Sequence, residues 1–152
     1  EYGKYIYCIN GDQTTRKSLL WIIKYPGRDI FADEIAARQR VADYYNAALA
    51  DVARVPKLMP GATSVWAQYT LIIEGNRKAI MEKCKAAGVP TMIYYPIPLS
   101  QQKGYQHYPS VPGGVPISER LAQSVLSLPM HPYLEQSTQD YIIDVVRDAL
   151  RG

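Results

Sequence analysis

The sequence predicts an α+β domain, in which a small mixed sheet carries helices on one face as in an α/β sandwich. Apolar residues recur at three-to-four spacing in a long segment after residue 28, which is the period of an amphipathic helix. Short β-prone runs then alternate with further helical patterns. The length of 152 residues, 47% of them hydrophobic and 20% charged, suits one domain with a sizeable core.

The first 28 residues are predicted to form a β-hairpin. Residues 2–9 and 18–25 are rich in Tyr, Ile, Leu and Trp, and the polar stretch between them begins with the turn dipeptide Asn10-Gly11. A different pattern starts after this segment. We therefore divide the chain into an N-terminal segment, residues 1–28, and a domain, residues 29–152.

The domain begins with a long helix, expected from Asp29 to about Val52, with Asp29 or Asp33 as its N-cap. Residues 64–74 are β-prone and predict a strand. Asn76 is then expected to cap a second helix. These three elements predict a helix, a strand and a helix in succession.

The second half of the domain is expected to contain two more strands and two more helices. Residues 91–95 and 125–128 predict the strands, and a short helix capped by Ser118 should lie between them. Residues 99–116 have no periodicity and are expected to form a long loop, of a kind that is usually functional or disordered. A last amphipathic helix is predicted over residues 137–151.

Composition and charge exclude several classes of partner. The net charge of +3 comes from 17 basic and 14 acidic residues spread along the chain, so we expect no nucleic-acid partner, although the 13 tyrosines could stack on bases beside a basic groove. No apolar run approaches the roughly 20 residues of a membrane span. The first residues do not read as a secretory signal. We expect a cytoplasmic protein with no membrane partner.

Residues that often act in catalysis give no catalytic pattern. Cys8 and Cys84 fit no metal-ligand or redox spacing and are interpreted as reduced, buried thiols. His107 and His131 stand beside Tyr or Pro in predicted loops, where a surface or hydrogen-bonding role is expected. The acidic pair Asp33-Glu34 suits the first turn of a helix. No metal site and no catalytic residue are predicted.

A set of local strings nevertheless occurs in a distinctive order along the domain. Together they resemble the C-terminal part of the DegT/DnrJ/EryC1/StrS family of nucleotide-sugar aminotransferases, over about four-fifths of the chain. The strings are residues 29–31, 34–42, 44–45, 65–70 (VWAQYT), 86–91 (AAGVPT), 95–99 (YPIPL) and 126–134 (LSLPMHPYL).

The resemblance implies an enzyme that transfers an amino group to a keto nucleotide-sugar in the biosynthesis of surface polysaccharides or other sugars. Family members hold pyridoxal phosphate on a lysine of a large N-terminal domain, within a cavity built around the cofactor ring. Lysines such as Lys24, Lys57, Lys83 and Lys85 lie in small-domain segments. The chain is therefore expected to bind no cofactor and to be inactive by itself.

The resemblance also implies substrate-binding residues. The family often has His-Tyr-Pro-Ile-Pro-Leu where this chain has residues 94–99, so Tyr95 matches and Tyr94 replaces the histidine. The other interpretation is that the two tyrosines only end a strand at a sheet edge. Upstream, Thr15 and Lys17 occupy the positions of the family's Arg and Asp, and the neighbouring Arg16 is the candidate to contact a phosphate of the nucleotide sugar.

A second function class remains open. The chain could be a free-standing or engineered α/β scaffold or interaction module that keeps the family's fold without catalysis. Without the large domain, apolar surface should be exposed. We therefore expect either a homo-oligomer or coverage of that surface by the N-terminal hairpin.

Overall fold

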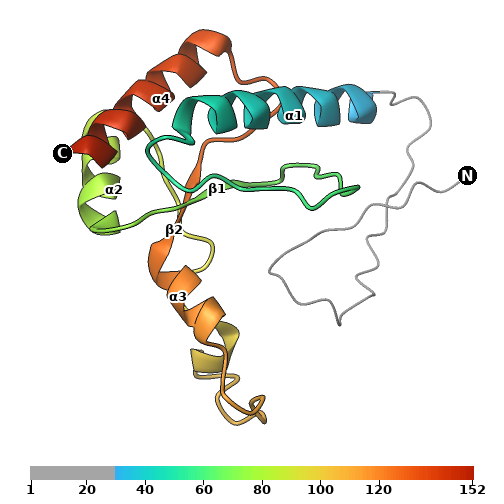
Figure 1. Ribbon diagram of the computed structural model, residues 1–152, viewed down its shortest axis with the longest axis vertical. Coiled ribbons are helices and arrows are strands. Elements are labelled where there is room, and N and C mark those ends of the chain that lie inside the picture. Colours follow the sequence, from blue (N-terminus) through green and yellow to red (C-terminus); the bar gives the residue numbers. More distant parts are fainter. Residues whose placement is uncertain (1–29) are drawn as a thin grey trace, which may run out of the picture.

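The computed structural model describes residues 30–152 (Figure 1). This part has four α-helices and a two-stranded antiparallel sheet, so the predicted α+β class is confirmed. The hairpin predicted over residues 1–28 lies outside the described residues. The elements in chain order are α1 (Ile30–Leu49), β1 (Tyr69–Ile72), α2 (Arg77–Ala86), the 3-10 helix η1 (Leu99–Gln101), α3 (Pro116–Ser124), β2 (Val125–Leu128) and α4 (Gln136–Arg151).

Helices α1, α2 and α4 supply most of the core. In α1 the buried residues Val41, Ala42, Tyr45 and Leu49 follow the helical spacing seen in the sequence. Helix α4 packs against both α1 and α2, as Figure 1 shows. Its Arg147 forms two hydrogen bonds with the Asp51 carboxylate, at 2.7 and 2.6 Å, and a third with the Ala48 carbonyl. This arginine joins α4 to the C-terminal end of α1.

The sheet is antiparallel throughout the described residues, so the predicted mixed sheet is wrong. Tyr69 pairs with Leu128 and Leu71 with Leu126, and these four residues form one buried face that belongs to the same core as the helices. Strand β1 is shorter than the predicted 64–74. Its late start follows from Trp66, whose φ of 47° interrupts extended backbone.

The strand predicted over residues 91–95 is also wrong. Only Met92 pairs with the sheet, through two backbone hydrogen bonds with Ser127 of 3.1 and 2.7 Å. Pro90, two residues earlier, lacks the N–H that the preceding pairing position would need, so the pairing does not continue on that side of Met92. The β-prone run therefore forms a single bridge at the outer edge of β2.

The starts of two short helices show where local signals succeed and fail. Asn76 caps α2 as predicted, since its Oδ1 accepts a hydrogen bond of 3.1 Å from the backbone N–H of Ala79. Helix α3 does not start after Ser118. It begins at Pro116, whose fixed φ suits the first turn of a helix. The predicted loop over residues 99–116 is therefore shorter, and η1 lies inside it.

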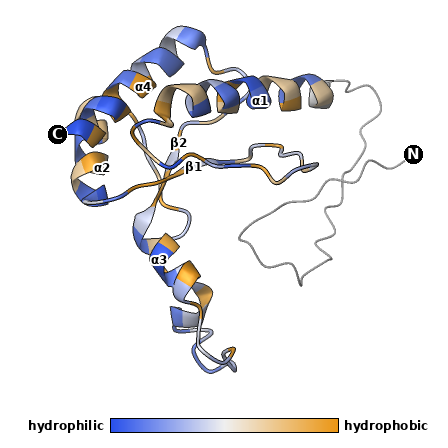
Figure 2. Cartoon of the chain, in the orientation of Figure 1, coloured by the Kyte–Doolittle hydropathy of each residue, from blue (hydrophilic) through white to orange (hydrophobic). Residues whose placement is uncertain are grey.

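Residues 97–124 form an arm that projects from the rest of the domain (Figure 1). Arg77 of α2 fixes its base, because Nη1 donates to the carbonyls of Ala122 and Val125 at 2.8 and 3.0 Å. Apolar positions recur along the arm (Figure 2). Several large apolar side chains on it are exposed: Ile97, Leu99, Tyr105, Tyr108, Val111 and Ile117.

Within residues 30–152, none of the helices combines the length and the apolar character needed to cross a membrane.

Candidate functional site

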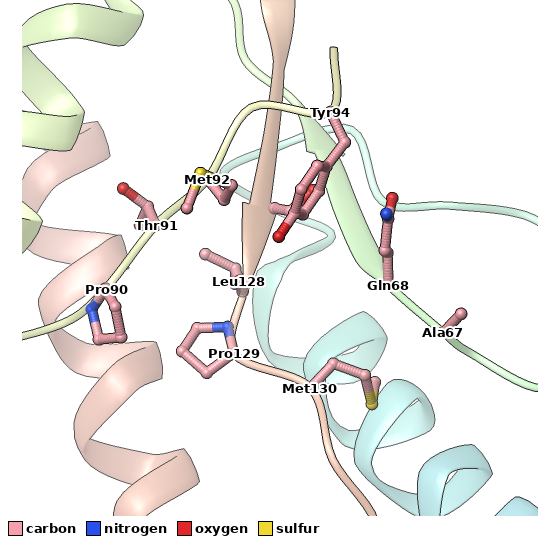
Figure 3. A pocket seen from close by; sticks show the side chains of 10 residues that line it. Ala67, Gln68, Pro90, Thr91, Met92, Tyr94, Leu128, Pro129 and Met130 are labelled. Carbon is pink, nitrogen blue, oxygen red and sulfur yellow. The ribbon is translucent and has the colours of Figure 1, made fainter.

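A cleft opens beside the sheet, between three segments of the chain (Figure 3). Ala67 and Gln68 line it from the segment just before β1, Pro90, Thr91, Met92 and Tyr94 from the segment after α2, and residues 127–130 from the end of β2. Its volume is about 370 Å³, which is at the lower end of the range for small-molecule pockets. The cleft is therefore large enough to hold part of a ligand.

Of the predicted substrate-binding residues, Tyr94 lines the cleft and Tyr95 is not among the lining residues. Tyr94 is 40% exposed and Tyr95 66% exposed, and their rings meet edge-on with centroids 5.8 Å apart. Arg16 lies outside the described residues. The structure thus places one of the two tyrosines at the cleft and the other beside it.

The lining of the cleft is mostly apolar, with a few polar groups. Pro90, Met92, Leu128, Pro129 and Met130 provide the apolar surface. The polar side chains are Gln68, Thr91, Tyr94 and Ser127, and no charged side chain is among the described lining residues. An apolar cleft with a few placed polar groups is typical of sites for small molecules.

Gln68 was not predicted from the sequence. Its side chain lines the cleft opposite Pro90 and Thr91 and lies on the same side as Tyr94 (Figure 3). The signal that could have found it is a single polar amide in the otherwise β-prone string VWAQYT. That signal is weak, because an exposed glutamine in a strand is ordinary.

The residue two positions before Gln68 has an unusual backbone. Trp66 is buried, with a φ of 47°, a region that bulky residues rarely occupy. Its N–H donates to Ser64 Oγ at 3.0 Å, its carbonyl accepts from Arg38 Nη1 at 3.0 Å, and its indole Nε1 donates to Gln39 Oε1 at 2.8 Å. Three hydrogen bonds therefore hold this conformation next to the cleft.

The described residues do not form a site for pyridoxal phosphate. Such a site needs a lysine enclosed in a cavity, with an acid facing the pyridine nitrogen. The lysines of residues 30–152 all have exposed side chains, and none lines the cleft beside Tyr94. Two of them, Lys78 and Lys85, border a second hollow of about 510 Å³ with Glu82 on the outer face of α2. The lysines are Lys57, Lys78, Lys83, Lys85 and Lys103.

The remaining candidates have structural surroundings. Cys84 is a fully buried free thiol, as the sequence predicted. Its burial raises the pKa of the thiol. Cys8 lies outside the described residues. His107 is exposed, and the centroid of its ring lies 4.4 Å from the centroid of the Tyr108 ring. Glu34 accepts a 2.5 Å hydrogen bond from the Tyr133 hydroxyl. No cluster of metal-ligating side chains occurs in the described part of the chain.

The comparison with protein families decides what this domain is. The model of the DegT/DnrJ/EryC1/StrS aminotransferase family matches residues 29–147. The chain belongs to this family. The family is dependent on pyridoxal phosphate in general, and the resemblance seen in the ordered strings is confirmed.

Similar proteins are more than twice as long as this chain. A Pseudomonas aeruginosa protein named UDP-2-acetamido-2-deoxy-3-oxo-D-glucuronate aminotransferase is 40% identical over 117 residues, which are 76% of this chain and 32% of that protein. A solved DegT DnrJ EryC1 StrS aminotransferase from Brucella abortus is 48% identical with a TM-score of 0.75, covering 79% of this chain and 32% of its own. The chain thus spans about a third of these relatives.

A third relative aligns with nearly all of the chain. The pleiotropic regulatory protein of Geobacillus stearothermophilus is 28% identical over 154 residues, which are 99% of this chain and 41% of that protein. Its alignment therefore extends into residues 1–28, where the family model does not match.

Proposed function

We propose that this chain is the C-terminal portion of a pyridoxal-phosphate-dependent aminotransferase that acts on a keto nucleotide-sugar in the biosynthesis of surface polysaccharides or other sugars. The observation that supports this most is the family match over residues 29–147, combined with relatives that are more than twice as long. The Pseudomonas aeruginosa relative, whose name specifies a UDP-linked 3-oxo sugar, indicates the class of substrate.

In this proposal the cleft is the contribution of the domain to the substrate site. Tyr94 would offer its hydroxyl, which can both donate and accept a hydrogen bond, to the nucleotide sugar. Tyr95 would contact the same substrate from the exposed side of the segment. Arg16 would bind a phosphate, because a guanidinium fits phosphate oxygens with two parallel hydrogen bonds.

Catalysis would need the rest of the enzyme. The lysines of residues 30–152 are exposed and none lines the cleft, which supports the proposal that this chain alone does not hold pyridoxal phosphate as an imine on one specific lysine. The test is to add pyridoxal phosphate and borohydride to the purified chain and to map any reduced adduct by mass spectrometry. We expect no preferred lysine and no transamination of a keto-sugar nucleotide. A single lysine trapped in high yield, with amino transfer, would show that the chain is catalytically competent.

Residues 1–28 are proposed to be a divergent continuation of the same family sequence. The alignment that covers 99% of the chain supports this. A cytoplasmic location also stays part of the proposal, supported by the free buried thiol of Cys84, since reduced cysteines are usual in that compartment.

A second candidate is a scaffold or interaction module without catalysis, which could be free-standing or engineered. The exposed apolar side chains of the arm favour it, because such surface often marks a contact with another protein. Titration of the ¹⁵N-labelled chain with a panel of UDP- and dTDP-sugars separates the two candidates. Shifts clustered at Tyr94, Tyr95 and residues 99–116 would support substrate binding, and their absence would favour the module.

A further inference from the structure

The charge of the cleft restricts which part of a nucleotide sugar could enter it. Pyrophosphate oxygens are normally bound by Arg, Lys, backbone N–H groups at helix N-termini or metal ions. None of the described residues that line the cleft is charged, and no N-terminal turn of a helix is among them. The cleft is therefore suited to the neutral, hydroxyl-bearing part of the ligand, which is the sugar ring.

The polar groups of the cleft differ in their availability. Ser127 is buried and its hydroxyl is engaged with that of Thr70, at 2.8 Å. The Gln68 carboxamide, by contrast, is exposed at the cleft, and no residue among 30–152 is hydrogen-bonded to it. A carboxamide presents two donors and an acceptor within one plane. Gln68 can therefore bind a hydroxyl or an acetamido group of a sugar ring.

The backbone that precedes Gln68 is held in a costly conformation. Strained residues persist only where their surroundings hold them, and they gather at ligand sites. Trp66 is such a residue, and three hydrogen bonds hold it: one with Ser64 of the preceding loop, and one each with Arg38 and Gln39 of α1. Regular pairing starts only at Tyr69, so the direction of Ala67 and Gln68 is set by Trp66 rather than by the sheet.

We propose that Gln68 is a specificity-determining residue, which hydrogen-bonds the sugar ring of the nucleotide sugar while Tyr94 borders the same cleft. This inference rests on the proposed function, because it takes the ligand class from it. It adds a residue that lies in one of the family strings, residues 65–70, but to which the resemblance assigned no role. It also assigns the two parts of the ligand to different places: the sugar lies in the cleft and the pyrophosphate lies outside it.

The test compares two ligands that differ only in the sugar. The intact 152-residue chain is titrated with UDP-N-acetylglucosamine and, separately, with UDP, and the dissociation constants are taken from ¹⁵N chemical shifts. Three variants are compared with the wild type: Gln68→Ala, the isosteric Gln68→Glu, and the control Gln123→Ala, which removes an exposed glutamine from α3. Since Gln68 is exposed, its variants should fold, and the dispersion of their spectra verifies this.

The wild type should bind the UDP-sugar more tightly than UDP. The ratio of the UDP dissociation constant to the UDP-sugar dissociation constant measures what the sugar adds to binding. Gln68→Ala and Gln68→Glu should reduce this ratio by about 3- to 10-fold, which is the effect of losing one or two hydrogen bonds. UDP binding by Gln68→Ala, and both affinities of Gln123→Ala, should equal those of the wild type.

Two other outcomes would overturn the inference in distinguishable ways. If both Gln68 variants bind the UDP-sugar as tightly as the wild type does, Gln68 has no role in specificity and the proposed function stands. If the wild type binds neither ligand, or binds the UDP-sugar no better than UDP, the proposed role of this domain in holding the sugar is wrong, and the inference about Gln68 fails with it.

Discussion

The indole Nε1 of Trp66 donates a hydrogen bond of 2.8 Å to Oε1 of Gln39, which precedes it by 27 positions. The same carboxamide donates through Nε2 to Asp43 Oδ1, also at 2.8 Å. The nitrogen of the Gln39 carboxamide is therefore held by Asp43 of the same helix, and its oxygen holds the indole of Trp66. The segment that leads into β1 is thereby attached to the helix layer.

Replacing Trp66 with Phe should lower the free energy of unfolding by about 2 kcal/mol, because it removes one hydrogen bond and part of a buried ring. Urea unfolding followed by circular dichroism measures the change. Tyr108→Phe, which alters only an exposed hydroxyl on the arm, is the matched control and should leave the midpoint unchanged. An unaltered midpoint for Trp66→Phe would show that the indole bond does not stabilise the fold.

Tyr45 and Tyr69 predict a loss of stability at high pH. Their rings are fully buried with centroids 4.8 Å apart, and burial raises the pKa of both phenols. The unfolded chain releases these protons near the ordinary tyrosine pKa of about 10, whereas the folded chain keeps them. The stabilisation is therefore complete below about pH 10 and declines as the pH rises towards the folded-state pKa.

Thermal unfolding between pH 8 and pH 11 measures this decline, with tyrosinate absorbance as a second signal. Tyr45→Phe removes one of the two phenols and the 3.0 Å hydrogen bond to the Pro129 carbonyl. It should cost about 1 kcal/mol at pH 7 and should make the alkaline decline shallower. Release of every phenol proton near pH 10 from the still folded chain would contradict the prediction.

Arg77→Met should loosen the base of the arm. Without the guanidinium, the carbonyls of Ala122 and Val125 lose their 2.8 and 3.0 Å bonds. The amides of α3 should then exchange with deuterium about 10-fold faster, while those of α4 stay as protected as in the wild type. Arg120→Met, which removes an exposed arginine of α3 itself, is the control. Equal exchange rates in both variants would show that Arg77 does not anchor the arm.

The exposed apolar residues of the arm predict self-association. Sedimentation velocity of the wild type should show a larger average mass at higher concentration, and Leu99→Gln combined with Ile117→Gln should reduce that dependence. Leu58→Gln with Met59→Gln, another exposed apolar pair, which lies after α1 and outside the arm, should not. A wild-type monomer at every concentration would leave coverage of this surface by residues 1–28 as the remaining expectation.

Most of the helices, which local patterns determine, were predicted, whereas the extent of strand pairing, which depends on distant partners, was only partly predicted. The helical spacing of α1 and α4 and the cap at Asn76 are local signals. Pairing of residues 91–95 depends instead on the distant strand β2, and only Met92 pairs with it. Helix α3 starts at Pro116 rather than after Ser118, because a proline at the first turn is itself a start signal.

In the candidate site, one lining residue could be predicted from a local string and another could not. The family resemblance pointed to Tyr94, and the structure places this residue at the cleft. Gln68 could not be found in this way, because its position depends on the left-handed backbone of Trp66. That conformation depends in turn on Arg38 and Gln39 of α1, which no local pattern in the sequence connects with residue 66.

The single bridges at the two sides of the sheet limit how copies of this chain could aggregate. Arg54 pairs with Ile72 on the outer side of β1, and Met92 pairs with Ser127 on the outer side of β2. A foreign strand adding to either side would have to displace one of these bridges, and beside Met92 it would also meet Pro90, which offers no donor. Assemblies of the chain should therefore form through side chains of the arm and should lack the cross-β order of amyloid.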